Sequence, residues 1–437
     1  MPANNLETAI GPAPIAVSRF RIVVLGAGIS GLSAAWFLKQ KHGKLVDITL
    51  IEKNGRPGGL IQSVQQDGFL FEKGPRSCRT KGNGRATLEL IEQLGLQNEV
   101  IPAHPSALKR YLFENGQLKQ LRTSSLLFSG LKALWQDWRM PAGPDRDQTI
   151  SEFFKRRIGL EWTERFIDPL VNGIYAGDIN TLSVKSCFPR YFQWEQQYGS
   201  LLKGALKQKR KSPSATPFVS RMEKTPIFSF KHGMETLPLA LAGQLDADIL
   251  YHSEIVEISS DKVVLKNGRT VAADLVISSL PAEEIEYATV GVVNLGYRSK
   301  VINQAGFGYL IARREKEQIL GCVFDSSVFP RNTDETCLTI MLGGALHQEV
   351  SAWNHEKCLF TAQEAARRHL GIQIAPDKYS ISIAKRAIPQ FQVGHSQWVD
   401  EAKKEKGVYR IGSSISGVAI NDCIVYAKNL ADDIVVC

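Results

Sequence analysis

The chain of 437 residues contains no run of about 18 apolar residues, the length that a membrane-spanning helix requires. Residues 1–18 lack the basic and apolar segments of a secretory signal, and they also lack the arginine-rich amphipathic pattern of a transit peptide. We therefore expect no transmembrane helix, and we interpret residues 1–18 as a tail.

Cysteine and histidine are few and dispersed. The seven cysteines include no C-x-x-C pair, and the eight histidines form no cluster along the sequence. This pattern argues against a zinc site, an iron–sulfur cluster and a disulfide framework, and it favours a reducing compartment. We predict that the protein holds no metal.

The charge balance restricts the class of partner. The formal net charge is +9, but basic and aromatic residues are not interleaved as they are in nucleic-acid-binding proteins, so we expect no nucleic-acid partner. An anionic membrane surface and an acidic small substrate suit this charge equally well. With 43% hydrophobic and 22% charged residues, the composition is that of a globular protein of two or three domains.

A nucleotide-binding pattern lies near the N-terminus. Residues 21–25 are mostly β-branched or large aliphatic and predict a buried parallel strand. Three glycines spaced as G-x-G-x-x-G follow at once, a helical pattern comes next, and a second strand at residues 47–51 ends on an acidic residue. This order is the fingerprint of dinucleotide binding. The cofactor-binding residues that it predicts are Gly26, Ala27, Gly28, Ser30, Gly31 and Glu52.

Each part of the fingerprint has a physical role. Gly26 permits the tight turn, Gly28 lets backbone N–H groups approach a pyrophosphate, and Gly31 lets the helix pack closely against the strand. The helix N-terminus adds partial positive charge for the phosphates. Glu52 can accept hydrogen bonds from ribose hydroxyls.

The residues that follow the acid indicate which dinucleotide binds. Lys53 and Arg56 are basic, and the pair Gly58-Gly59 lets the chain pass close to the flavin side of the cofactor. A basic residue and a glycine pair at this place are typical of FAD-binding, amine-oxidase-like flavoproteins. Arg56 can also reach a phosphate.

A second strand–glycine–helix pattern closes the chain. Residues 407–412 predict a strand that ends on glycine, residues 413–417 are a loop of small residues, and a final helix follows. The N-terminus of that helix can point at the pyrophosphate or at the flavin. Its first residues, which we assign to the cofactor, are Val418, Ala419 and Ile420.

The middle of the chain predicts a hairpin at residues 108–121 and an amphipathic helix at residues 123–140. The helix is either attached to a membrane or turned towards a core, and the sequence leaves both interpretations open. We expect an irregular stretch at residues 171–178 and a loop in the basic, proline-containing run at residues 207–226. The apolar residues that share one helix face, with two aromatic neighbours, are Leu127, Leu131, Leu134, Trp138, Phe128 and Trp135.

Narrower motifs lie further along the chain. They are Ser-Cys-Phe-Pro at residues 186–189, Gly-Phe-Gly-Tyr-Leu at residues 306–310 and Met-Leu-Gly-Gly at residues 341–344. With these motifs and the nucleotide-binding segments, the chain resembles the oxygen-dependent, FAD-containing protoporphyrinogen oxidases over about residues 20–433.

The resemblance implies an activity and partners. It implies that FAD is bound non-covalently and that protoporphyrinogen IX is oxidised to protoporphyrin IX in haem biosynthesis, in three flavin cycles with molecular oxygen as acceptor. It also implies peripheral membrane contact, a homodimer and hand-off of the product to ferrochelatase. The implied location is the cytoplasm with peripheral attachment to the inner membrane, and the alternative is the mitochondrial inner membrane.

The resemblance also assigns residues to the site. Arg110 matches an arginine that meets a propionate of the substrate, and Gly173 matches a glycine beside the macrocycle. The residues that match the sandwich around the macrocycle are Leu310, Val323 and Met341. The further residues assigned to the cofactor are Gly74, Pro75, Arg76 and Ile255.

We expect an α/β fold in three parts. The first part is a Rossmann-like FAD-binding domain formed by residues 20–85, 228–285 and 405–437. The second part, residues 90–210, is a hairpin with a helical insertion. The third part, residues 290–400, is a substrate domain with a mixed sheet. Three alternative functions remain open. The first is a coproporphyrinogen III oxidase, whose pocket must provide partners for four propionates. The others are an FAD-dependent amine oxidase and a flavin-binding scaffold without catalysis.

Overall fold

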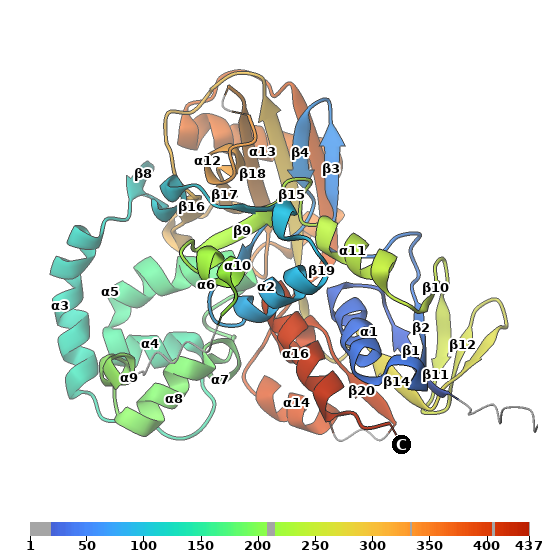
Figure 1. The fold of residues 1–437 in the computed structure, drawn as a ribbon. Coiled ribbons are helices and arrows are strands. Elements are labelled where there is room, and N and C mark those ends of the chain that lie inside the picture. Colours follow the sequence, from blue (N-terminus) through green and yellow to red (C-terminus); the bar gives the residue numbers. More distant parts are fainter. Residues whose placement is uncertain (1–18, 208–214, 333, 404–406, 437) are drawn as a thin grey trace, which may run out of the picture.

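The computed structural model describes residues 19–207, 215–332, 334–403 and 407–436. Figure 1 shows three parts: a parallel sheet with helices at the lower right, a mixed sheet above it, and a group of helices at the left. The predicted tail at residues 1–18 and residues 208–214 of the basic run lie outside the described residues. The predicted α/β fold class is confirmed.

The parallel sheet has the strand order β10-β2-β1-β14-β20. Both faces of β1 are buried, because Ile22 and Val24 pack on one side while Val23 and Leu25 pack on the other. A strand that is buried on both faces has a continuous apolar sequence, and such a run at residues 21–25 predicted β1 correctly. The strands are β1 (Phe20–Leu25), β2 (Val46–Ile51), β10 (Asp248–Leu250), β14 (Leu275–Ser278) and β20 (Val408–Arg410).

Helices cover one face of this sheet, and a three-stranded antiparallel meander covers the other. The first helix, α1, packs against the last helix, α16, although almost the whole chain separates them (Figure 1). The helices are α1 (Ile29–His42), α2 (Gly84–Gln93), α11 (Thr236–Gln244) and α16 (Ile420–Asp433), and the meander is β11 (Ile255–Ile258), β12 (Lys262–Leu265) and β13 (Thr270–Ala272).

The mixed sheet has seven strands in the order β19-β15-β18-β17-β16-β7-β8. Its back face packs on helix α13 (His355–Leu370), and only the pair β16 and β7 is parallel. The strands are β7 (Tyr111–Glu114), β8 (Gln117–Gln120), β15 (Tyr287–Tyr297), β16 (Gly308–Ile311), β17 (Ile319–Val323), β18 (Thr336–Gly343) and β19 (Lys378–Pro389).

Two features of this sheet differ from the sequence analysis. The hairpin β7–β8 is an edge of the sheet, because Leu112 pairs with Leu310, whereas we expected the hairpin to belong to the helical insertion. The long strand β15 has no predicted counterpart. Gly291, Asn294 and Gly296 interrupt its apolar pattern, so its sequence does not alternate cleanly.

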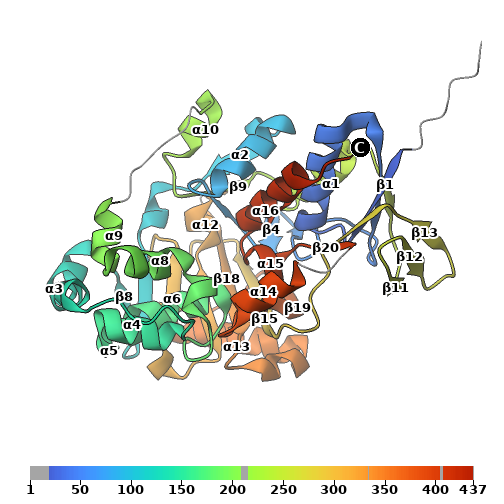
Figure 2. The same cartoon turned by 90° about the horizontal axis from the view of Figure 1, so that it is seen from below.

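The helical insertion begins with α3, and in both views α3 lies at the outer edge of the molecule (Figures 1 and 2). None of the described helices is both long and apolar enough to span a membrane. The helices are α3 (Thr123–Arg139), α4 (Ile150–Ile158), α5 (Leu160–Trp162), α6 (Asp168–Tyr175), α7 (Val184–Cys187), α8 (Pro189–Tyr198) and α9 (Leu201–Lys207), with a π-helical turn at Thr163–Ile167.

Two segments expected to be irregular are partly helical. The first half of the predicted irregular stretch, residues 171–175, is the end of α6, which stops at Ala176 in a left-handed conformation with φ +47°. The predicted loop contains helix α10 (Pro217–Met222), because Thr216 caps it by accepting a hydrogen bond from the Val219 N–H. Both helices are short, so their periodicity was too brief to detect.

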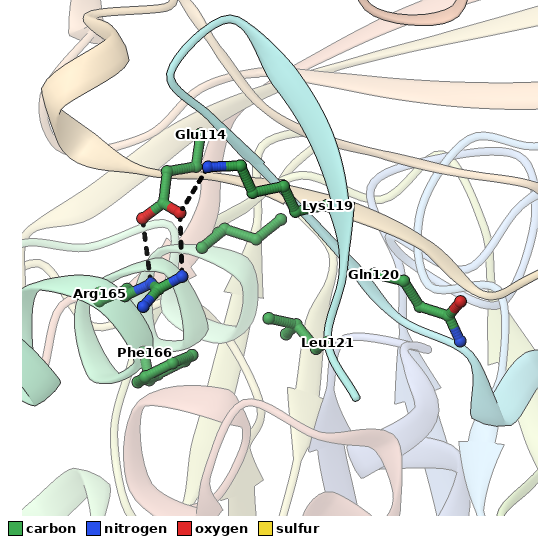
Figure 3. Close-up of a pocket in the computed structure, with 7 residues that line it drawn as sticks. Glu114, Lys119, Gln120, Leu121, Arg165 and Phe166 are labelled. Carbon is green, nitrogen blue, oxygen red and sulfur yellow. Dashed lines mark hydrogen bonds and ion pairs between the residues drawn. The ribbon is translucent and has the colours of Figure 1, made fainter. Parts of the chain in front are cut away.

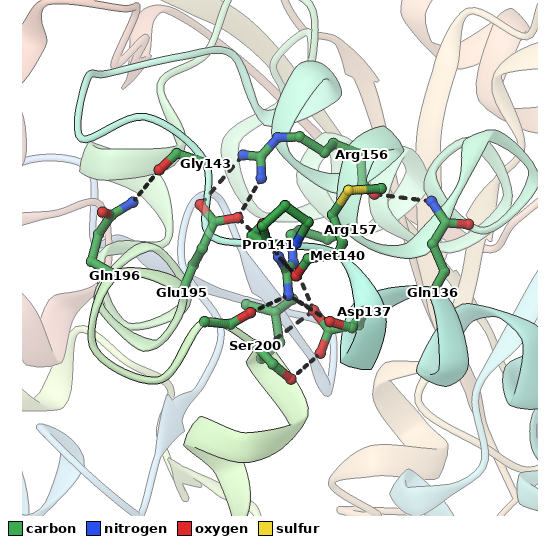
Figure 4. A network of polar contacts seen from close by, with 12 residues as sticks. Gln136, Asp137, Met140, Pro141, Gly143, Arg156, Arg157, Glu195, Gln196 and Ser200 are labelled. Atoms are coloured by element: carbon green, nitrogen blue, oxygen red, sulfur yellow. Dashed lines mark hydrogen bonds and ion pairs between the residues drawn. The ribbon is translucent and has the colours of Figure 1, made fainter.

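A buried ionic network fixes α3 to the rest of the insertion (Figure 4). The fully buried Arg157 of α4 pairs with Asp137 of α3 at 2.6 Å and with Glu195 of α8 at 3.3 Å. Asp137 also accepts a hydrogen bond of 2.6 Å from the Ser200 hydroxyl. Because each buried charge has partners, α3 is anchored through its C-terminal half.

A small sheet in the order β5-β9-β6 lies between the two larger sheets. Phe228 and Phe230 pack into the core of the parallel-sheet part, whereas Ile227 packs against residues of the mixed sheet. The remaining strands and helices are β3 (Ser63–Gln66), β4 (Phe69–Glu72), β5 (Cys78–Arg79), β6 (Val100–Pro102), β9 (Ile227–Phe230), α12 (Asp325–Val328), α14 (His395–Ala402) and α15 (Ser413–Ser416).

Candidate active site

The fingerprint glycines lie where β1 turns into α1. Gly26 has φ +90°, and its N–H donates to the carbonyl of Ile51 at 2.8 Å, which ties the turn to β2. A Cβ on Gly31 would lie 2.0 Å from the carbonyl oxygen of Gly26, so helix and turn touch at this point. Both positions therefore require glycine for the reasons that the spacing suggested.

Glu52 is buried at the end of β2 and holds the same turn. Its carboxylate accepts hydrogen bonds from the Ala27 N–H at 2.9 Å and from the N–H and side-chain amide of Asn54, both at 2.8 Å. The neighbouring Lys53 is exposed. The acid thus orders the glycine turn in addition to the ribose-binding role that the sequence predicts.

The pair Gly58-Gly59 crosses directly over the fingerprint. The N–H of Gly58 donates to the carbonyl of Ala27 at 2.8 Å, and a Cβ on Gly59 would lie 3.4 Å from the Cα of Gly28. The structure therefore brings the two glycine-rich segments together. Small residues on both sides permit this close approach.

Arg56 braces the glycine pair. Its guanidinium donates to the carbonyl of Gly59 at 2.7 Å and pairs with Glu235 at 3.1 Å. The sequence analysis assigned Arg56 to a phosphate, whereas these contacts give it loop carbonyls and a carboxylate. The sequence could not show this, because Glu235 lies in a distant segment.

The start of α1 fits a pyrophosphate. Gly28 is the N-cap residue, no side chain caps the helix, and no acidic residue lies in its first turn. A Cβ built on Gly28 would meet no atom within 4 Å, so the space beside these N–H groups is open. Ser30 is buried in the same first turn. Uncapped N–H groups and the helix dipole together favour an anion here.

The C-terminal segment closes on the same point. A Cβ on Gly412 would lie 3.3 Å from the carbonyl oxygen of Ser279. The hydroxyl of Ser279 donates a hydrogen bond of 2.7 Å to the carbonyl of Leu25. Helix α16 then begins with Ala419 as its N-cap, between Val418 and Ile420, and again no side chain caps it. Residues from both ends of the chain thus meet at the carboxyl end of β1.

Gly74, Pro75 and Arg76 connect this part to the mixed sheet. A Cβ on Gly74 would lie 2.1 Å from the carbonyl of Leu60, so the segment passes close to the glycine pair. Arg76 pairs with Asp325 at 3.2 Å, and Asp325 accepts a hydrogen bond of 2.6 Å from Thr339 of β18. Arg76 is therefore held at the junction of the two parts.

Ile255 is the first residue of β11, and the residues just before it contact Glu52 at the end of β2. The N–H of Ser253 donates to the carbonyl of Glu52 at 2.9 Å. Ile255 itself packs against the core beneath the parallel sheet. The structure therefore places it near the ribose end of the fingerprint.

Three strands of the mixed sheet present an aliphatic wall. Leu310 lies opposite Gly321, and Gly321 lies opposite Met341 on the next strand. Val323 lies two residues beyond Gly321, so its side chain points to the same face. The sequence did not suggest Gly321, although an isolated glycine within an apolar strand signals a close approach.

This aliphatic wall faces the cofactor part. On the same face, the Thr339 hydroxyl lies 2.7 Å from the side-chain carbonyl oxygen of Asn294, and the Asn294 amide donates to the carbonyl of Glu72 at 3.0 Å. Glu72 comes two residues before Gly74. These polar residues were missed, because short sequence patterns do not show which distant strands pair.

Gly173 and Arg110 border the wall. A Cβ on Gly173 would lie 2.6 Å from a methyl carbon of Leu310, so α6 touches the wall at this glycine. The guanidinium of Arg110 lies 5.2 Å from the ring centre of Phe307, which packs with Val323 and its neighbours. The structure thus brings together all five residues that the resemblance assigned to the substrate.

A separate cavity of about 210 Å³ lies between the hairpin β7–β8 and the π-helical turn (Figure 3). The buried Glu114 pairs there with Arg165 at 3.1 Å, with Lys119 at 3.4 Å and with Arg314. Ligand pockets for molecules of drug size span roughly 300–1,000 Å³, so this cavity is too small for a tetrapyrrole. Its ionic contacts lock the hairpin to the insertion.

Comparisons with known proteins agree with this geometry. Residues 29–435 match the family described as flavin containing amine oxidoreductase. The chain is 34% identical to the protoporphyrinogen oxidase of Bos taurus, over 94% of this chain and 97% of that protein. It is 28% identical to the coproporphyrinogen III oxidase of Bacillus subtilis (strain 168), with coverage of 94% and 97%.

The chain belongs to the protoporphyrinogen oxidase family of flavin-containing amine oxidoreductases. It is therefore an FAD-dependent oxidoreductase, and the predicted cofactor is confirmed. The fold agrees: a solved protein from Exiguobacterium sp. 255-15 has a TM-score of 0.79 at 22% identity, covering 95% of this chain and 98% of that one. Reduced UDP-galactopyranose mutase shares the fold at a TM-score of 0.70 and 14% identity, covering 95% and 94%.

We predict that the FAD is held without a covalent bond. Cys423, the cysteine nearest the start of α16, is buried, and its Sγ lies 3.4 Å from the Ser416 hydroxyl. Burial raises the pKa of this thiol, which makes it a poor nucleophile. Acid precipitation should release all of the yellow colour into the supernatant, as measured by absorbance. Colour that stays with the precipitated chain would contradict the prediction.

Proposed function

We propose that the chain oxidises protoporphyrinogen IX to protoporphyrin IX with molecular oxygen as the acceptor. The observation that carries this proposal is the aliphatic wall of β16, β17 and β18, which faces the FAD-binding segments and has Arg110 at its rim. A largely apolar macrocycle with charged propionates at one edge needs such a surface. The similarity to the Bos taurus protein supports the same substrate.

The side chains position the substrate and exclude water. Leu310, Val323 and Met341 offer methyl and methylene groups to one face of the macrocycle, and Gly321 keeps the wall flat between them. Arg110 pairs with a propionate at the edge. When bound, FAD supplies the hydride acceptor, so that the protein's contribution is orientation rather than acid–base chemistry.

The wall argues against amine oxidation. An amine oxidase typically surrounds its substrate with aromatic rings, whereas the residues on this wall are aliphatic, with Gly321 between them. An aliphatic surface suits the broad face of a porphyrinogen. The aliphatic wall therefore gives no support to the amine-oxidase alternative.

The test compares two porphyrinogens with the purified protein under air. Protoporphyrinogen IX should be oxidised with the higher kcat/KM, and it should bleach the flavin absorbance when oxygen is removed. A higher kcat/KM with coproporphyrinogen III would instead select the activity that the name of the Bacillus subtilis relative states. Failure of both compounds to bleach the flavin would exclude the proposed reaction.

We also propose that α3 attaches the protein peripherally to a membrane. Leu131, Leu134, Trp135 and Trp138 are exposed by 63%, 43%, 61% and 50%, although the opposite side of α3 is buried at Ala133 and Asp137. Lys203 lies 4.7 Å above the Trp138 ring, and Arg139 lies 4.7 Å from the Trp135 ring centre. Exposed tryptophan and leucine beside basic residues suit a helix that lies in an anionic lipid surface.

The exposure of these four side chains supports this proposal over the alternative of a core-facing helix. Leu127 and Phe128, which we assigned to the same region, have side chains outside the described part. Peripheral attachment to the inner membrane stays a prediction. The homodimer and the hand-off to ferrochelatase stay predictions.

Removing apolar area from this face should release the protein from lipid. The double variant Leu131→Ser, Trp138→Ser should no longer sediment with vesicles of anionic phospholipid, because burial of each side chain contributes about 1.5–3 kcal/mol. Activity in detergent should remain. The control is Leu239→Ser, which removes a leucine that is 50% exposed from α11. Unfolding of the double variant in detergent would contradict a purely interfacial role.

A further inference from the structure

Arg79 lies on the short strand β5, and its position in the β5-β9-β6 sheet determines its direction. Cys78 pairs with Phe228, and Arg79 pairs with Ile227, in antiparallel register. Residues directly opposite each other in antiparallel strands share a face. Because Cys78 and Phe228 face the core of the parallel-sheet part, Arg79 and Ile227 face the other side.

That other side is the substrate wall. Ile227 packs in one cluster with Val323, and Phe307 and Met341 lie against the same cluster. Arg110 lies over the ring of Phe307. Two arginines from separate segments, β5 and the start of the hairpin, therefore border the same apolar surface.

The two guanidinium groups influence each other electrostatically. Burial lowers the pKa of Arg110, and the positive charge of Arg79 lowers it further. Burial raises the pKa of Tyr175 on α6, and the positive charge of Arg79 opposes this rise. Within the described ranges, neither arginine forms an ion pair with a carboxylate side chain. Two neighbouring cations of this kind attract a dianion.

We propose that Arg79 is a second propionate anchor, so that Arg79 and Arg110 each bind one carboxylate of a porphyrinogen that carries two. This inference rests on the proposed function. It adds a residue that limits how many propionate groups of the substrate the site can pair. A guanidinium can hold a carboxylate through two parallel hydrogen bonds. A substrate with four propionates would place the other two towards the aliphatic wall, where burying an unpaired charge is costly.

The backbone of Arg79 is fixed to the cofactor part. Its carbonyl accepts a hydrogen bond of 3.0 Å from the side-chain amide of Asn421, near the start of α16. Asn421 is held in turn by the Thr87 hydroxyl at 2.7 Å. The same carbonyl would lie 1.9 Å from a Cβ on Gly84, so the chain is closely packed there. The anchor is therefore positioned relative to the helix that borders the FAD site.

The first experiment replaces Arg79 in the FAD-loaded enzyme. Arg79→Ala should lower kcat/KM for protoporphyrinogen IX by about 10- to 150-fold, the effect of losing one charged hydrogen-bonding partner. Most of the loss should appear in KM, since anchoring acts on the bound substrate before reaction. Arg79→Lys should recover part of it. The matched control is Lys81→Ala, which removes one positive charge from an exposed neighbour in the same segment.

The second experiment separates anchoring from a structural effect. The dimethyl ester of protoporphyrinogen IX has no propionate charge, so Arg79→Ala should change its turnover by less than about threefold. Two results would overturn the role of Arg79 as an anchor while leaving the proposed function intact. One is a loss of kcat/KM in Arg79→Ala that is equal for the free acid and the ester. The other is a loss no larger than that of Lys81→Ala. A wild-type enzyme that does not oxidise protoporphyrinogen IX would overturn the proposed function and the anchor with it. If Arg79→Ala does not fold, Arg79→Gln permits the same comparison.

Discussion

Gly31→Val should yield a protein that contains no FAD. The Cβ would lie 2.0 Å from the carbonyl oxygen of Gly26 and 3.1 Å from the hydroxyl of Ser279. The first atom belongs to a backbone that is tied to Ile51 by a hydrogen bond, so it cannot move without disrupting the turn. The branched side chain must therefore displace α1 from β1. Overpacking of this kind costs several kcal/mol when the opposing atom is backbone.

Two further glycine variants separate folding from cofactor binding. Gly28→Ala adds a Cβ that meets no protein atom within 4 Å, so this variant should fold. It should bind FAD poorly, because the methyl group occupies the space beside the N-terminus of α1. Gly243→Ala on α11 also meets no atom within 4 Å and serves as the control. The measurements are the ratio of flavin to protein absorbance and the thermal unfolding midpoint. Full flavin loading of Gly31→Val would show that the fingerprint was misinterpreted.

Local pattern predicted the cofactor-binding part of this fold more completely than the mixed sheet. The strand β1, the helix α1 and the acid Glu52 are adjacent in sequence, and each has a distinct chemical pattern. The hairpin β7–β8 was found as a hairpin but joined to the wrong part, because its partner β16 lies about two hundred residues away. Pairing between distant strands leaves no periodic signal in either strand.

The same limit explains which site residues were missed. Leu310, Val323 and Met341 came from a resemblance, and the cross-strand register explains why they lie on one face of the sheet. Arg56 was assigned to a phosphate, although its partner Glu235 comes from another segment. The sequence analysis gave Arg79 no role in the site. Its direction became evident only through its pairing with Ile227.

Arg110→Ala should lower kcat/KM for protoporphyrinogen IX by about 10- to 150-fold. A charged hydrogen bond contributes roughly 1.5–3 kcal/mol, and each ~1.4 kcal/mol corresponds to a factor of ten. Flavin content should not change, because the guanidinium lies over Phe307 on the substrate side of the wall. Lys109→Ala is the control, since it removes the neighbouring exposed charge.

The division between KM and kcat tells which task Arg110 performs. If it only anchors a propionate, KM rises and kcat holds, because the same contact is lost from the bound substrate and from the transition state. If it also determines which bridging carbon of the macrocycle approaches the flavin, kcat falls as well, since a displacement of about 1 Å can cost on the order of a hundredfold in rate. Arg110→Lys should restore only part of either loss, because an ammonium group cannot form the paired hydrogen bonds of a guanidinium. Kinetics equal to those of Lys109→Ala would place Arg110 outside the site. The substrate wall would then have to be defined by Leu310, Val323 and Met341 alone.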